Sequence, residues 1–148
     1  MKFPARFSLL LLLFCAPLVH AWDRPEMARY GAAYAGPELL RVYVAHTKAD
    51  DYAVIKIHGI NHPLDQHIYW AKVRYQEGYP ERIYYAAKEK EGERVVFFVN
   101  GASATLKLPN YHGQALAELR LSYDGDESTR TAPEHLLTDY ARQIGAIQ

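Results

Sequence analysis

Apolar and polar side chains alternate with a period of two along much of the 148-residue chain, and this period restricts the fold more than any other feature. Leu40, Val42 and Val44, for example, are separated by single polar or amphipathic residues. Side chains two residues apart share one face of a β-strand, so each such segment is predicted to be a half-buried strand. These segments are residues 40–44, 52–60, 69–75, 83–87, 104–108 and 115–123. A seventh segment, residues 95–99, is continuously apolar, which is typical of a strand covered on both faces.

Short turns separate the seven segments, and two helix-start patterns flank them. In such a pattern a capping residue is followed three positions later by Glu. Asp23 and Glu26 predict a short helix over residues 24–35, and Thr131 and Glu134 predict one over residues 135–144. We therefore expect a mainly β (α+β) fold, a single small antiparallel β-barrel or sandwich of about seven strands with a short N-terminal and a C-terminal helix.

Residues 1–21 have the composition of a secretory signal peptide. Lys2 and Arg6 precede an apolar run, and Val19-His20-Ala21 offers a cleavage sequence. The apolar run is shorter than the about 20 residues that a membrane-spanning helix needs. We predict a periplasmic or secreted protein, cleaved after Ala21, with no stable membrane insertion afterwards and a single β-rich domain over residues 22–148.

The cysteine and charge content excludes several chemistries. Cys15 is the only cysteine and lies in the predicted leader, so the mature chain would have neither disulfides nor thiolate metal ligands. Lys and Arg total 17, as do Asp and Glu, and no basic cluster stands out. This balance argues against nucleic acid as a partner.

The chain contains 12 tyrosines, and tyrosine is common both in half-buried strands and at binding surfaces. Because no catalytic spacing accompanies them, we predict a binding module that engages an envelope protein or a ligand through tyrosine-rich strands or loops. The candidate contact residues are Tyr69, Tyr75, Tyr84 and Tyr111.

Three histidines and one aspartate gather at the turn between the second and third predicted strands. His58, His62, Asp65 and His67 supply the imidazole and carboxylate groups that zinc or copper binds when thiolates are absent. The alternative function is therefore a small-ligand or metal carrier that uses this turn. The competing interpretation is that Asn61, Pro63 and Asp65 make the turn while the histidines are surface residues or hydrogen-bond partners.

Catalytic motifs are weak. Ser103 is the nearest candidate nucleophile, yet no G-x-S-x-G surrounds it, and Asp50 and Asp51 are adjacent on an extended chain, so their side chains are expected to point apart. Residues 124–127 are acidic but do not follow the calcium-binding EF-hand pattern. An enzyme is not favoured, and no cofactor is predicted beyond the zinc or copper of the alternative.

Overall fold

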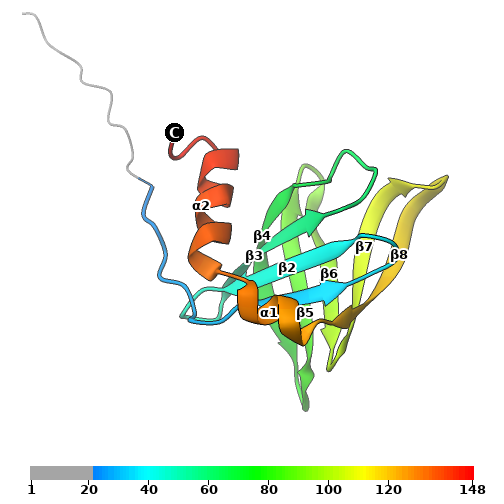
Figure 1. Ribbon diagram of the computed structural model, residues 1–148, viewed down its shortest axis with the longest axis horizontal. Helices are drawn as coiled ribbons and strands as arrows, with labels where there is room; N and C mark the ends of the chain where they lie inside the picture. Colours follow the sequence, from blue (N-terminus) through cyan, green and yellow to red (C-terminus); the bar gives the residue numbers. More distant parts are fainter. Residues whose placement is uncertain (1–21) are drawn as a thin grey trace, which may run out of the picture.

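Eight strands pair in chain order, each antiparallel to the next, and the last strand returns to the first to close a barrel (Figure 1). The computed structural model describes residues 22–148, so the predicted signal peptide lies outside the described residues. The strands are β1 (Ala32–Ala35), β2 (Arg41–His46), β3 (Tyr52–His58), β4 (Ile68–Gln76), β5 (Tyr79–Glu89), β6 (Gly92–Asn100), β7 (Ser103–Tyr111) and β8 (Gln114–Tyr123). The prediction of a small antiparallel barrel is confirmed, with eight strands in place of about seven.

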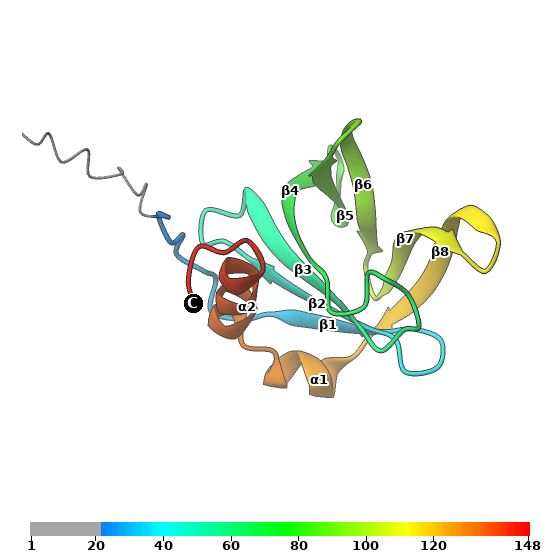
Figure 2. The ribbon, with the colours of Figure 1, turned by 90° about the horizontal axis from the view of Figure 1, so that it is seen from above.

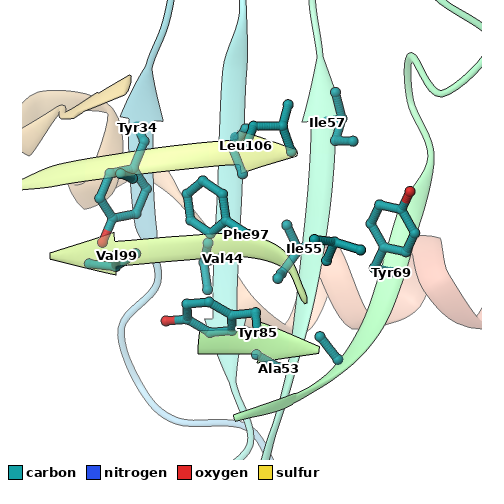
Figure 3. Packing of buried hydrophobic residues seen from close by; sticks show 14 of the residues in the cluster. Tyr34, Val44, Ala53, Ile55, Ile57, Tyr69, Tyr85, Phe97, Val99 and Leu106 are labelled. Atoms are coloured by element: carbon teal, nitrogen blue, oxygen red, sulfur yellow. The ribbon is translucent and has the colours of Figure 1, made fainter. Parts of the chain in front are cut away.

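Side chains fill the interior of the barrel. The register sets Val42 opposite Ile57 and Val44 opposite Ile55, so the apolar face of each strand points inward. Figure 3 shows Val44, Ile55 and Ile57 packing near the aromatic ring of Phe97, which is fully buried. Each large apolar side chain removed from water contributes about 1.5–3 kcal/mol, which makes this core a main source of stability.

The barrel has two ends, which we name after the tyrosines whose hydroxyl groups point toward them. The hydroxyl groups of Tyr34 and Tyr85 lie on one side of the core, and that of Tyr69 lies on the opposite side (Figure 3). The Tyr85 end carries the loops at residues 47–51, 77–78 and 101–102. The Tyr69 end carries the loops at residues 36–40, 59–67, 90–91 and 112–113.

Two helices follow the barrel, α1 (Gly125–Arg130) and α2 (Pro133–Gln143). The second confirms the predicted C-terminal helix and packs Leu136 and Leu137 against the outer face of β2–β4 (Figure 2). The side-chain amide of Gln143 donates to the carbonyl of Ile68 at 2.7 Å and accepts from its N–H at 2.8 Å. No helix among the described residues is long and apolar enough to cross a membrane.

The predicted N-terminal helix over residues 24–35 is wrong. Residues 22–31 make only an isolated bridge between Met27 and Thr47, and Ala32–Ala35 forms β1. In β1, Tyr34 pairs with Val42 of β2 on one side and with Tyr123 of β8 on the other, and this pairing closes the barrel. Long-range pairing therefore outweighs the local capping pattern at residues 23–26.

The projecting hairpin of β7 and β8 explains how a strand continues through a proline. The strand predicted over residues 104–108 ends before Pro109, yet β7 runs through Pro109 to Tyr111. Pairing between β6 and β7 stops at Leu106, whereas β7 stays paired with β8 beyond that point (Figure 2). Pro109 thus has a strand neighbour on one side only, and its missing N–H leaves no acceptor of a central sheet unpaired.

Candidate functional site

A chain of hydrogen bonds crosses the Tyr85 end and joins four side chains from β2, the following loop, β4 and β5. The Tyr75 hydroxyl donates to Asp50 Oδ2 at 2.6 Å, and Asp50 Oδ1 is hydrogen-bonded to His46 Nδ1. His46 Nε2 lies 2.7 Å from the Tyr85 hydroxyl. An ionised carboxylate can only accept, so His46 Nδ1 donates to Asp50, and in that tautomer Nε2 accepts from the Tyr85 hydroxyl.

The loop at residues 47–51 aims Asp50 at this network. Asp50 adopts the left-handed backbone region with φ 61°, which aspartate tolerates better than most residues. Its N–H donates to the carbonyl of Thr47 at 2.9 Å, and the Thr47 hydroxyl donates to Asp51 at 2.9 Å. These bonds close the loop over four residues and hold His46 and Asp50 face to face.

The environment keeps the carboxyl group charged and the phenols neutral. Burial raises the pKa of Asp50, but the hydrogen bonds from Tyr75 and His46 outweigh it, so the pKa lies below its ordinary value of 3.8. Burial, followed by the bond to Asp50, raises the pKa of Tyr75 to about 12. Burial also raises the pKa of Tyr85. The site therefore presents one anion among phenolic hydroxyl groups at neutral pH.

A hollow of about 440 Å³ opens beside this network. Its walls include the rings of Tyr30, Tyr34 and Tyr85, together with His46 and Asp50. Aromatic rings beside a few convergent polar groups of shifted pKa are typical of binding sites in the mouths of barrels.

The most exposed tyrosines of the described chain gather at the same end. Tyr30 is 76% exposed, and Tyr75, Tyr79 and Tyr123 are each about half exposed. The strand register places Tyr75, Tyr79 and Tyr123 beside the loops of the Tyr85 end, and Tyr30 lines the hollow there. Exposed tyrosines that ring a polar hollow form an amphipathic surface of the kind that is enriched at interfaces.

The four tyrosines predicted as contact residues do not converge. Tyr75 belongs to the network just described, whereas Tyr69 is buried and faces the opposite end. Tyr84 lies on the outside of β5 with its ring stacked 4.6 Å from that of Phe98. Tyr111 lies on the projecting hairpin. Of the predicted set, only Tyr75 belongs to the hydrogen-bond network of the Tyr85 end.

The predicted metal ligands at the turn have separate partners. His58 is hydrogen-bonded to Gln66, and His62 Nε2 donates to the carbonyl of Pro109 at 2.7 Å. Asp65 Oδ1 accepts from the N–H groups of Gly59 and Ile60, as an aspartate that makes a turn does. The ring of His67 packs edge-on against Tyr69 at 4.6 Å.

Within residues 22–148, no group of three or more His, Cys, Asp or Glu side chains is arranged to hold one metal ion. The zinc or copper site stays a prediction. It is tested by titrating zinc into the mature chain without a histidine tag, where sub-stoichiometric uptake would contradict it.

A second hollow, of about 540 Å³, opens at the Tyr69 end and bears on the small-ligand alternative. His67, Tyr69, Glu89 and Pro109 contribute to its walls. Burial lowers the pKa of His67 and raises the pKa of Tyr69. The packed core separates this hollow from the one at the Tyr85 end, so neither is an enclosed cavity of the carrier type.

Sequence reasoning missed His46, Asp50 and Tyr85 as a unit. His46 and Asp50 flank a tight loop four residues apart, which is a local signal, but Tyr85 joins them from 39 residues away.

The chain matches no model of a known protein family, no curated protein and no solved structure.

Proposed function

We propose that this chain is an exported binding module that engages a basic segment of another protein at the Tyr85 end. A cationic side chain of that segment would enter the hollow and contact Asp50. The observation that carries the proposal is the position of the ionised Asp50 carboxylate among the tyrosine rings of that end.

The Asp50 carboxylate has acceptor capacity left for a ligand. Each of its oxygens accepts one hydrogen bond, from His46 or from Tyr75, and a carboxylate accepts about four. Its side chain is 49% exposed, so a donor can reach it from solvent. Ammonium and guanidinium groups are the donors that bind a carboxylate most strongly.

The aromatic walls favour the same class of ligand. A cation that lies over the face of a tyrosine ring is attracted by about 0.5–2 kcal/mol, depending on how fully it is desolvated. The end already contains such a contact, because the Arg82 guanidinium lies 4.4 Å from the centre of the Tyr79 ring. The Arg29 guanidinium likewise lies 5.3 Å from the centre of the Tyr30 ring, which lines the hollow beside Asp50.

The charges of the surrounding loops add to this preference. Asp51, Glu77 and Glu81 are exposed at the Tyr85 end. Of the bases there, Lys48 lines the hollow and is paired with Glu26 at 2.9 Å, and Arg29 and Arg82 lie over the rings of Tyr30 and Tyr79. The remaining negative charge attracts a basic segment over about one Debye length, so high salt weakens the association.

The proposal is tested with a short peptide of lysines that has an acetylated N-terminus and free side-chain ammonium groups. The peptide is titrated into the mature chain, and binding is followed by calorimetry. We expect saturable binding, weakened about tenfold by Asp50→Asn because one charge-assisted contact is lost. Asparagine tolerates the left-handed backbone and keeps one acceptor, so the loop is expected to fold. Glu118→Gln on β8 makes the same change in net charge far from the hollow and is the matched control.

Two outcomes would reject the binding proposal. One is the absence of saturable binding at low salt. The other is equal weakening by Asp50→Asn and Glu118→Gln, which would mean that net charge alone attracts the peptide. Export is tested separately, by recovering the protein from the periplasm or medium and sequencing its N-terminus, which is expected to begin at Trp22.

A further inference from the structure

A third hollow lies on the outside of the barrel, between β2–β3 and the junction of α1 with α2. Its volume is about 310 Å³, and we call it the helix groove. Tyr43, Lys56 and His58 form one wall, and Arg130, His135 and Leu136 form the other. The groove is separate from the Tyr85 end, because its walls are outward-facing residues of the strands and residues of the helices.

The charged side chains that line the helix groove are cationic. Lys56 and Arg130 face it, and no carboxylate is among the described residues of its walls. The carboxylates that pair with these cations stand outside the lining. Asp139 lies 3.1 Å from Lys56 Nζ, and Glu127 lies 3.3 Å from Arg130.

These ion pairs leave the cations available to a ligand. Exposed pairs contribute about 0–1 kcal/mol, so a well-placed oxyanion can share or replace the partner carboxylate. Arg130 is 72% exposed and retains free N–H donors in its planar fork. Lys56 is more deeply placed, with 21% exposure, which reduces the water that competes for its ammonium group.

Polar and apolar groups complete the walls. The imidazoles of His58 and His135 add donors from opposite sides, and each gains positive charge when it is protonated. The Tyr43 hydroxyl is engaged with Glu127 at 3.3 Å, so the tyrosine offers mainly its ring. That ring and Leu136 give an apolar surface on which an organic body can pack.

We propose that the helix groove binds a small organic phosphate. Donors on both walls suit a tetrahedral oxyanion with several acceptor oxygens, because phosphate can accept from Lys56, Arg130 and the histidines together. The volume exceeds what a bare ion would occupy, and the apolar patch accommodates the remainder of a phosphate monoester.

Phenyl phosphate is the probe, with binding to the mature chain followed calorimetrically and by NMR shifts of the His58 and His135 rings. We expect saturable binding that is tighter than that of inorganic phosphate. Arg130→Gln is expected to weaken it about tenfold. Arg142→Gln is the matched control, since Arg142 pairs with Asp139 at the same three-residue spacing on α2 but lies outside the groove.

Three results would overturn the proposal. The first is no saturable binding of phenyl phosphate, and the second is equal weakening by Arg130→Gln and Arg142→Gln. The third is binding to vesicles that contain an anionic phospholipid without competition by phenyl phosphate, which would identify a lipid surface in place of a small molecule. Because Arg130 is exposed, its substitution is expected to leave the fold intact, and circular dichroism checks this.

Discussion

Asp50 illustrates how one residue can serve both folding and binding. Its carboxylate joins His46 and Tyr75, which ties the loop at residues 47–51 to β4. A strand-and-turn pattern predicts a loop at this position, but it cannot predict that the loop turns its carboxylate inward. The left-handed backbone of Asp50 and the distant Tyr75 decide that orientation together.

At this scale we predict a pH-dependent effect of Asp50→Asn on stability. The folded-state pKa of Asp50 lies below its ordinary value of 3.8, so its contribution is complete above the unfolded-state pKa and is lost as the pH falls through the folded-state pKa. Because Asp50 is half exposed, Asp50→Asn is expected to lower the unfolding free energy at pH 7 by only about 1 kcal/mol. Urea unfolding at pH 7 and at pH 3 measures the difference, which is expected to shrink at pH 3.

The control for this effect is Glu118→Gln, for which no change in unfolding free energy is expected at either pH. Glu118 makes no salt bridge among the described residues. The unfolding free energies of Asp50→Asn and the parent chain are compared at both pH values. If their difference stays constant from pH 7 to pH 3, ionisation of Asp50 does not stabilise the fold.

Elements are predictable where the sequence pattern and the tertiary environment agree. Each of the seven segments chosen from the apolar pattern lies within a strand except at Leu40 and residues 59–60, because each buries one face in the barrel. Residues 24–35 are the exception. Their capping pattern is local, whereas the pairing of Tyr34 with Tyr123 joins the first strand of the barrel to the last. The candidate site is less predictable for the same reason: its side chains meet through long-range pairing.

The projecting hairpin gives the prediction at the scale of the element. Pro109→Ala is expected to change the unfolding free energy by less than about 0.5 kcal/mol, because only β8 pairs with this part of β7. Thr105→Pro is expected to cost more than about 2 kcal/mol, because Thr105 pairs with both Phe98 and Arg120 and any lost N–H leaves an acceptor unpaired. Chemical denaturation compares the two variants, and similar costs would show that the β6–β7 contact extends to Pro109.

At the scale of the whole molecule, the packed core makes the barrel a scaffold with binding surfaces outside it. Tyr34, Phe97 and Ile55 occupy the interior, so the Tyr85 end and the helix groove present ligands to separate faces. Closure of this scaffold depends on a short seam. β1 pairs with β8 only through Tyr34 and Ala35, whereas the other neighbouring strands share longer ladders.

Helix α1 secures this seam through one buried hydroxyl group. Ser128 is 6% exposed, and its Oγ accepts from the N–H of Ala33 in β1 at 2.8 Å. Ser128→Ala leaves that N–H unpaired and is expected to cost about 1–3 kcal/mol. Hydrogen exchange is expected to accelerate in β1 more than in β3, whose two neighbours remain paired. Ser122→Ala is the control, because Ser122 is exposed and joins the seam by its backbone alone. If Ser128→Ala accelerates hydrogen exchange equally in β1 and β3, Ser128 supports the whole barrel and not its seam.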